Sequence, residues 1–273
     1  MEKNVLIKIE YDGSAFHGWQ RQPGLRTVQG ELEMVLSQLC GQSIEVSGTG
    51  RTDRGVHAMA QCATFKGDFG IPVENIPKAA NAMLSDRKNT AGTAIGDVRI
   101  LSAKQVDSDF HARFSCKGKT YSYRICTGEP HVFRRNYVYY VKDRLDLDRM
   151  KRAAAHIVGT HDFKCFEAAG GNPRETTVRT IYDVKIYMEE GDLVIDVTGD
   201  GFLYNMVRII AGTLVDIGRG KMDPDFVKMI IQQGKRSLAG HTAPPYGLYM
   251  KEIYFSDDFK EVRRDEQEMG NKF

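Results

Sequence analysis

The sequence has no long hydrophobic run and no recognisable export signal, and each shortage excludes a class of protein. No stretch of 18 or more apolar residues occurs, which excludes a transmembrane helix. Residues 1–11 contain a short, strand-like apolar stretch and lack the apolar core and small-residue cleavage site of a secretory signal peptide. We therefore expect a cytoplasmic protein that does not associate with membranes.

Cysteine is also scarce. Five cysteines occur in 273 residues, an odd number, and none forms a C-x-x-C pair. This pattern is typical of reduced thiols in a cytosolic protein, and it argues against a disulfide framework and against a zinc site. The cysteines are Cys40, Cys62, Cys116, Cys126 and Cys165.

Net charge is small, at +2, but the charges are unevenly distributed. Residues 111–152 hold eleven Lys and Arg against four Asp and Glu, and aromatic residues are interleaved with them. Cations for phosphates beside rings for bases are typical of a nucleic-acid surface. A solvated strand edge protected by lysines explains the same pattern, so both readings stay open here. Residues 256–273 are rich in acids and poor in apolar residues, and we expect a disordered tail there.

The order of strand-like and helix-like segments predicts an α+β fold of two halves. Alternating apolar residues in 178–199, around Glu190-Gly191-Asp192, predict an antiparallel hairpin with one covered face. The predicted domains are an α+β half over 1–108, a second over 109–255, and the tail 256–273. Strands are expected at 4–11, 43–50, 57–67, 91–106, 119–128 and 136–142, and helices at 27–40, 72–85, 145–162, 206–218 and 223–233.

The first of these helices has clear start and stop signals. Val28, Leu32 and Val35 belong to one apolar stripe. Thr27 is the expected N-cap, although Gly30 replaces the glutamate of a full capping box, and Gly41 is the expected stop.

A glycine-rich stretch at 47–58, SGTGRTDRGVHA, is the most suggestive chemical motif. It has neither the G-K-[ST] of a phosphate loop nor the glycine spacing of a dinucleotide-binding turn. Asp53 lies two residues after Arg51 and directly before Arg54, and these cations favour an ionised carboxylate. An ionised carboxylate without a second acid suits a nucleophile better than an acid–base pair. An aspartate that only stabilises a turn is the competing interpretation.

Five blocks together resemble the tRNA pseudouridine synthase A family. GTGRTDRGVHA resembles the catalytic motif of that family. The other four are YDGSAFHGWQRQ with RTVQGELE, DFHARFSCKGKTYSYRI, GDGFLYNMVRIIAGTLVDIGRGK and TAPPYGLYM. They occur in the order of the family and span nearly the whole chain apart from the acidic tail.

The resemblance implies isomerisation of uridine to pseudouridine at positions 38, 39 and 40 in the anticodon stem-loop of tRNAs. It implies two α+β halves that share a continuous antiparallel or mixed sheet, with helices on one side and a central RNA-binding cleft. It also implies a homodimer that uses no metal and no organic cofactor. The target nucleotide must be flipped out of its stack, which costs about a few kcal/mol.

The same resemblance assigns roles to individual residues. Asp53 takes the place of the catalytic nucleophile, and Arg51 that of the arginine holding the flipped-out state. Tyr121 matches the active-site tyrosine that covers the uracil and assists proton removal. Arg208 matches an arginine that pairs with the aspartate, and an arginine within the apolar run 202–215 independently needs an acidic partner.

Further residues are expected to contact the substrate. Leu248 is expected beside the base, although a plain core role fits equally well. Lys117 and Lys119 belong to the basic, aromatic stretch. Arg54 departs from the family, which commonly has a small residue there; it either contacts a phosphate or faces solvent.

Two other functions remain to be weighed. A non-catalytic RNA-binding protein on the same fold would bind RNA through the same basic stretch and leave Asp53 structural. A carboxylate-dependent hydrolase of nucleosides or sugars would need a second acid near Asp53, and the sequence offers none convincingly linked to it.

Overall fold

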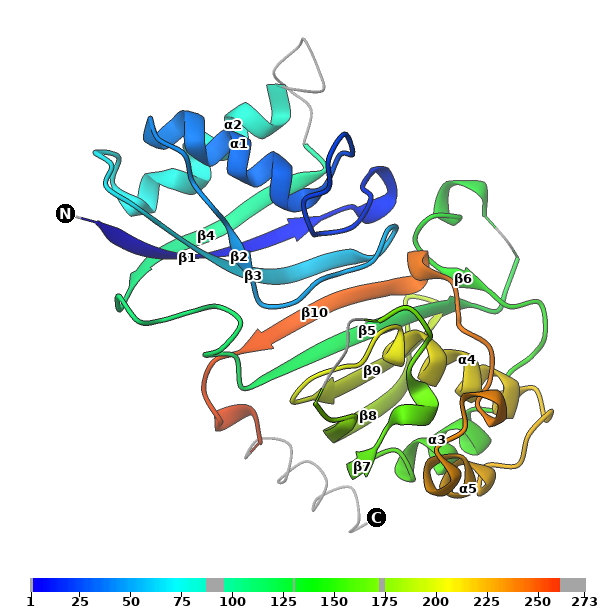
Figure 1. Ribbon diagram of the computed structural model, residues 1–273. Coiled ribbons are helices and arrows are strands. Elements are labelled where there is room, and N and C mark those ends of the chain that lie inside the picture. The colour runs from blue at the N-terminus through cyan, green and yellow to red at the C-terminus, as the bar shows by residue number, and fades with distance from the viewer. Residues whose placement is uncertain (1, 87–95, 130, 172–174, 261–273) are drawn as a thin grey trace. The chain divides into compact units, whose positions relative to one another are not determined.

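The computed structural model describes residues 2–86, 96–129, 131–171 and 175–260. Its contacts divide the chain into two compact units: Met1–Cys116 with Tyr249–Phe255, and Lys117–Leu248 with the residues from Ser256 on. Each unit combines a β-sheet with helices (Figure 1), which confirms the predicted α+β class. No helix in the described ranges is long and apolar enough to cross a membrane. Most of the expected acidic tail, 261–273, lies outside the described residues.

The sheet of the first unit has the strand order β4-β1-β3-β10, with β2 paired to β3. Strands β1 and β3, and β1 and β4, pair antiparallel. Strand β10 runs parallel to β3, with Tyr249 opposite His57. A segment from the far end of the sequence therefore completes the sheet of the N-terminal unit. The strands are β1 (Lys3–Tyr11), β2 (Ser47–Gly48), β3 (His57–Gly67), β4 (Val98–Val106) and β10 (Leu248–Tyr254).

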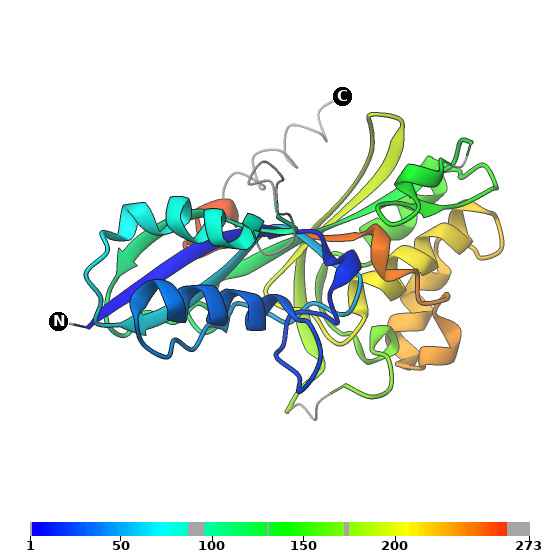
Figure 2. The same cartoon turned by 90° about the horizontal axis from the view of Figure 1, so that it is seen from above.

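Two helices, α1 (Val28–Cys40) and α2 (Ile76–Asp86), cover one face of this sheet (Figures 1 and 2). The Thr27 hydroxyl accepts a hydrogen bond from the Gly30 N–H at 3.3 Å, and Gly41 adopts a left-handed φ of 66°. Both predicted ends of α1 are thereby confirmed. Short 3-10 helices precede each, η1 (Gly13–Ala15) and η2 (Val73–Asn75).

The sheet of the second unit has the order β5-β9-β8-β7, with β6 paired parallel to β5. The predicted hairpin is formed by β8 and β9, and both turn residues, Glu190 and Gly191, have positive φ. Positive φ at both positions matches the right-handed twist of the flanking strands. The strands are β5 (Gly118–Cys126), β6 (Tyr139–Tyr140), β7 (Gly159–Asp162), β8 (Val178–Glu189) and β9 (Asp192–Gly199).

Helices α3 (Leu147–Ala155), α4 (Met206–Gly218) and α5 (Phe226–Gln233) pack against this sheet (Figure 1). The helix expected over 145–162 is shorter than predicted, because Gly159 has a φ of 121° and the residues after it pair with β8 as β7. The strands expected over 43–50 and 136–142 shrink to two residues each. Short 3-10 helices complete the unit: η3 (Val132–Arg134), η4 (Lys164–Phe166), η5 (Arg236–Leu238) and η6 (Pro245–Gly247).

Candidate active site

The loop between β2 and β3 carries Asp53 and is closed by its own main chain. The Val56 N–H donates to the Asp53 carbonyl at 3.1 Å, and Gly55 supplies a φ of 80°. A glycine is favoured at that angle because it has no Cβ to clash with the backbone. This turn-closing hydrogen bond joins two main-chain groups.

Residues from the YDGSAFHGWQRQ block, 11–22, which we call the N-terminal signature, contact the loop directly before Asp53. The Trp19 main-chain N–H donates to the Thr52 carbonyl at 3.0 Å. The Tyr11 hydroxyl and the Thr52 hydroxyl share a hydrogen bond of 2.8 Å. All three side chains are buried. The residue before Asp53 is therefore fixed through both its main chain and its side chain.

Close approach of the backbone explains glycines in two motifs, the block 11–22 and the glycine-rich stretch 47–58. A Cβ on Gly13 would lie 2.0 Å from the Val56 carbonyl oxygen, and one on Gly48 would lie 2.6 Å from the Trp19 ring. Gly18 has a φ of 91°, and a Cβ there would lie 2.8 Å from the Thr52 carbonyl oxygen. The two motifs, distant in sequence, fit together only because side chains are absent at these contacts.

The loop is also fastened to β3. The Thr49 N–H donates to the Cys62 carbonyl at 2.9 Å, and the Gln61 side-chain amide donates to the Gly50 carbonyl at 2.9 Å. Gln61 is fully buried, and its amide oxygen accepts from the Thr49 hydroxyl. Buried polar groups with satisfied hydrogen bonds define one conformation of the main chain that contains them.

The result is a rigid loop with a charged outer side. Thr52 and Val56 are buried, Asp53 is half-buried, and Arg51 and Arg54 are exposed. A carboxylate on an anchored main chain, flanked by two accessible guanidinium groups, can meet a polyanionic substrate while the loop that carries it stays in place.

His57, four residues after Asp53, is a supporting residue that our sequence reasoning left without a role. Its Nδ1 accepts the Gly13 N–H at 3.1 Å, and the Asp12 carboxylate lies 3.2 Å from the same nitrogen. Its buried ring stacks on Tyr249 of β10 with the ring centroids 4.7 Å apart. Its place inside the GTGRTDRGVHA block was the available signal, but the block does not reveal which residues surround it.

Tyr121, Arg208 and Leu248, the other predicted active-site residues, lie in the second unit. Tyr121 is on β5 opposite Val197, is 8% exposed, and makes an edge contact with Phe202 at 5.2 Å between ring centroids. Leu248 is buried and begins β10.

Arg208 lies in the first turn of α4 and is held by local acceptors. Its Nε donates to the Ala243 carbonyl at 2.7 Å, and its NH1 donates to the Asn205 side-chain oxygen at 2.6 Å. The Ala243 N–H donates back to the Arg208 carbonyl at 3.1 Å. The acidic partner expected from the sequence stays a prediction.

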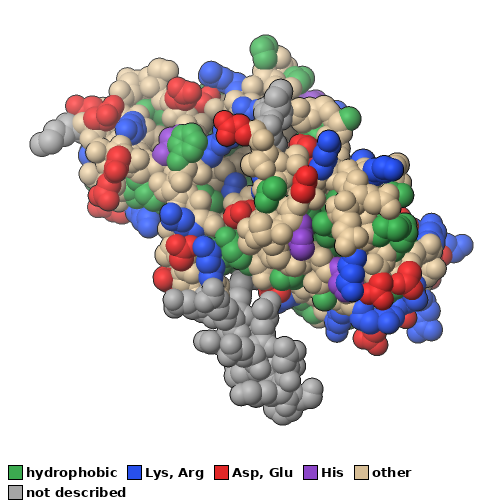
Figure 3. All heavy atoms as spheres, turned by 60° about the horizontal axis from the view of Figure 1, so that its bottom comes forward, with side chains coloured by type: hydrophobic (Ala, Val, Ile, Leu, Met, Phe, Trp, Pro, Cys, Tyr) green, Lys and Arg blue, Asp and Glu red, His purple; other side chains and the backbone are tan. Residues whose placement is uncertain are grey.

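The basic stretch is divided between structural and accessible cations. Arg124 pairs with Glu189, Arg134 pairs with buried Asp192, and Arg149 donates to main-chain carbonyls. Lys119 is half-buried on β5. On the face drawn in Figure 3, basic and acidic side chains are intermixed. The exposed cations are Arg113, Lys117, Arg135, Lys142, Arg144, Lys151 and Arg152. Among the residues that the structure describes, no three His, Cys, Asp or Glu side chains form a metal-binding group.

Comparisons with known proteins match almost the whole chain to proteins of one kind. The family model described as tRNA pseudouridine synthase matches residues 7–115 and 153–256. A tRNA pseudouridine synthase A from Acetivibrio thermocellus is 43% identical over 93% of this chain and 100% of its own length. One from Halalkalibacterium halodurans is 46% identical over 90% of each chain, and a tRNA pseudouridine synthase A 2 from Clostridium perfringens is 42% identical over 93% of this chain and all of its own.

Proposed function

We propose a mechanism from one premise: the chain belongs to the tRNA pseudouridine synthase family, matched over both of its units. It is an isomerase that converts uridine to pseudouridine in tRNA. The target positions we propose are 38, 39 and 40 in the anticodon stem-loop. We further propose that the enzyme works as a homodimer in the cytoplasm, without a metal or organic cofactor.

Asp53 is the proposed nucleophile. The observation that carries this proposal is the anchoring of the Asp53 loop, in which buried Thr52 and Val56 hold a half-buried carboxylate between two exposed arginines. A nucleophile must be held in a reactive geometry before the substrate arrives, because positioning supplies much of the rate enhancement.

The isomerisation needs no external reactant. The carboxylate of Asp53 attacks the target nucleotide, at C1′ of the ribose or C6 of the base, and the glycosidic C1′–N1 bond breaks. The uracil rotates, C5 bonds to C1′, and the C5 proton is lost while N1 gains one. The atoms of uridine and pseudouridine are therefore the same, and Asp53 is released unchanged.

The remaining predicted residues take supporting roles in this proposal. Arg51 holds the flipped-out state, because a planar guanidinium can stack on bases and bind phosphate together. The Tyr121 ring covers the uracil, its hydroxyl assists proton removal from C5, and Leu248 packs beside the base. Arg208 pairs with the carboxylate of Asp53.

The cations Arg54, Lys117 and Lys119 are proposed to contact tRNA phosphates. Such contacts supply affinity and register but carry no sequence information. They are predicted equally by a non-catalytic RNA-binding protein, which membership of this enzyme family does not favour.

The test is pseudouridine formation in an anticodon stem-loop tRNA transcript, with Asp53→Asn compared with wild type. Asparagine keeps the shape of the side chain and removes its charge. We expect the variant to bind tRNA and to form no pseudouridine. Asp107→Asn, an exposed aspartate of the same unit, is the matched control and should retain full activity.

Three results would contradict the proposal. Near-full activity of Asp53→Asn would show that Asp53 only stabilises its turn. Binding without isomerisation by the wild type would favour the RNA-binding protein. Release of free uracil would indicate a hydrolase.

A further inference from the structure

The segment 239–243, between η5 and η6, lies directly on the backbone of α4. A Cβ on Gly212 would lie 1.9 Å from the His241 carbonyl oxygen, and a Cβ on Gly240 would lie 2.6 Å from the Thr213 Cα. The Gly240 N–H donates to the Thr213 hydroxyl at 2.9 Å. With no side-chain layer between them, a shift of the segment relative to the helix changes the hydrogen bonds between the two.

One end of this segment holds the Arg208 guanidinium. Ala243 and Arg208 exchange two hydrogen bonds, one from Nε to the Ala243 carbonyl and one from the Ala243 N–H to the Arg208 carbonyl. The direction in which the guanidinium extends from α4 therefore depends on where the Ala243 carbonyl lies.

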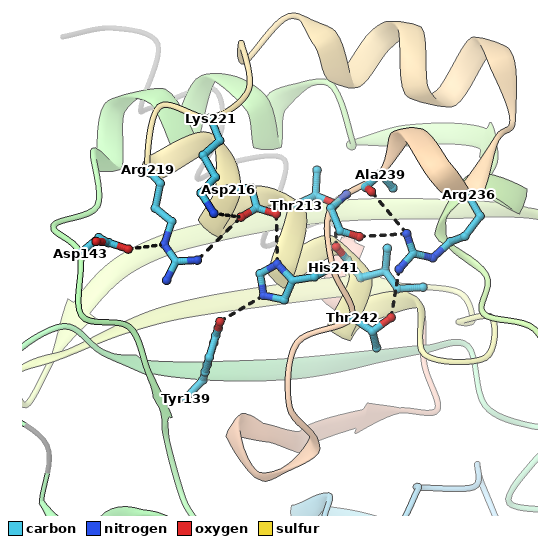
Figure 4. Close-up of polar contacts among 12 residues, drawn as sticks. Tyr139, Asp143, Thr213, Asp216, Arg219, Lys221, Arg236, Ala239, His241 and Thr242 are labelled. Carbon is cyan, nitrogen blue, oxygen red and sulfur yellow. Dashed lines mark hydrogen bonds and ion pairs between the residues drawn. The ribbon is translucent and has the colours of Figure 1, made fainter.

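Two residues earlier, His241 fastens the segment through both ring nitrogens (Figure 4). Its Nδ1 lies 3.0 Å from an Asp216 carboxylate oxygen, and its Nε2 lies 3.1 Å from the Tyr139 hydroxyl. Asp216 is further surrounded by Arg219 and Lys221, at 3.8 and 3.7 Å. The segment is thereby tied to the fourth turn of α4 and to the short strand β6.

The hydrogen-bond directions in this cluster are consistent with one another. Burial raises the pKa of Tyr139, so its hydroxyl stays protonated and can donate to the Nε2 of His241. The matching tautomer carries its proton on Nδ1, from which it can donate to the Asp216 carboxylate. A carboxylate behind an imidazole fixes both the tautomer and the orientation of the ring.

Arg236 holds the segment 239–243 independently of His241. Arg236 donates to the Gly240 carbonyl at 2.9 Å and to the Thr242 hydroxyl at 3.0 Å (Figure 4). Loss of the imidazole therefore leaves the segment attached, so the expected consequence is a small displacement and not unfolding.

We propose that His241 is a positioning residue for Arg208, acting through the main chain of 241–243 with Asp216 and Tyr139 as its anchors. The inference rests on the proposed function of Arg208 in tRNA isomerisation. It adds a residue outside the predicted site whose effect on the reaction is transmitted to the guanidinium.

The first experiment compares His241→Ala with His156→Ala under single-turnover conditions. His156 pairs with Asp225 at 2.8 Å in the same unit, so it is a matched histidine–aspartate control. We expect His241→Ala to lower the rate about tenfold, because small misplacement of an active-site group costs one to two powers of ten. The tRNA Kd should stay within about twofold, and His156→Ala should match wild type.

Rescue separates the hydrogen bond from ring packing. His241→Asn places an amide N–H near the former Nδ1, so it should retain the contact with Asp216 and recover most of the rate. Equal losses in His241→Ala and His241→Asn, or a wild-type rate in His241→Ala, would overturn the proposal.

A double-mutant cycle tests whether the effect passes through Arg208. Lysine has no Nε–H to donate to the Ala243 carbonyl, so in an Arg208→Lys background the addition of His241→Ala should change the rate by less than about twofold. A second tenfold loss in that background would mean that His241 acts independently of Arg208, and it would overturn the proposal.

A readout that needs no activity distinguishes this inference from the proposed function. In protein carrying ¹⁵Nε-arginine, the Arg208 Nε–H should exchange with solvent about tenfold faster in His241→Ala than in wild type or His156→Ala. Unchanged exchange overturns the positioning of Arg208 by His241, whatever the activity. A wild type that forms no pseudouridine overturns the proposed function, and the exchange result still decides whether His241 positions Arg208.

Discussion

The main-chain N–H of Trp19 is hydrogen-bonded to the carbonyl of Thr52 at 3.0 Å, directly before Asp53. Trp19 itself is buried, and its ring lies against Gly48 at the start of the same loop. The N-terminal signature thus serves as a support for the Asp53 loop, and it can be tested by substitutions that do not touch Asp53.

Gly18→Ala should displace the loop. The new Cβ would lie 2.8 Å from the Thr52 carbonyl at a φ of 91°, so clash and backbone strain act together. We expect a loss of about 2–4 kcal/mol in the free energy of unfolding, measured by denaturant titration, and a reduced rate of pseudouridine formation. Gly24→Ala is the matched control, because Gly24 has a φ of 71° and a Cβ added there would meet no heavy atom within 4 Å. It should cost about 1 kcal/mol and leave the rate unchanged; equal effects of the two variants would contradict this role of Gly18.

The buried hydrogen bond between Tyr11 and Thr52 should show strong coupling. Thr52→Val leaves the Tyr11 hydroxyl without this partner and should cost about 1–3 kcal/mol in the free energy of unfolding. Adding Tyr11→Phe removes the second hydroxyl as well. The double variant should therefore lose less free energy of unfolding than the sum of the losses in the two single variants. Additive losses would show that the two hydroxyls contribute independently.

Arg54→Ala should change tRNA binding more than chemistry. The side chain is exposed beside Asp53, and a phosphate contact there would contribute about one unit to the slope of log Kd against log salt concentration. We expect a slope smaller by about one and a nearly unchanged single-turnover rate. Arg99→Ala, an exposed arginine paired with Glu10 at 3.1 Å, is the control and should leave the slope unchanged. The same slope in wild type and Arg54→Ala would place Arg54 in solvent.

Two buried thiols should make the protein less stable in alkali. Burial raises the pKa of Cys62 to about 12 and that of Cys165 to about 11, both above the ordinary value of 9.0. Below pH 9 both thiols are neutral in the folded and unfolded chains, so their contribution is constant. Above pH 9 the unfolded chain ionises first, and the free energy of unfolding should fall by about 1 kcal/mol per thiol by pH 10.

Denaturant titrations at pH 8 and pH 10 measure this change. Cys62→Ala removes one titrating group. The decrease in the free energy of unfolding between pH 8 and pH 10 should therefore be smaller by about 1 kcal/mol in the variant, whatever the variant's stability at pH 8. An unchanged fall in the variant would show that Cys62 does not ionise on unfolding. Alkylation read by mass spectrometry at pH 8 should also leave Cys62 and Cys165 unmodified in the native protein, because only the thiolate reacts.

Much of the local structure could be predicted because its causes are local. Thr27 and Gly41 define the ends of α1, and the Glu190-Gly191 turn defines the hairpin, through contacts with residues a few positions away. The expected helix over 145–162 was wrong beyond Ala155 because pairing of β7 with β8 outweighs local helical propensity. The sequence alternation at 178–181 indicates a strand there, but it does not indicate that residues 159–162 pair with it.

The family of the protein and the choice of Asp53 as its candidate nucleophile could both be read from the sequence, because they rest on short contiguous blocks with fixed residue types. Three other features became visible only in the folded chain: Trp19 supports the Asp53 loop, β10 completes the N-terminal sheet, and His241 contacts Asp216 on the helix that carries Arg208. These are hydrogen bonds and packing contacts between distant residues. They form when the chain buries its apolar surface and must satisfy each buried polar group, and that requirement acts on the folded chain as a whole.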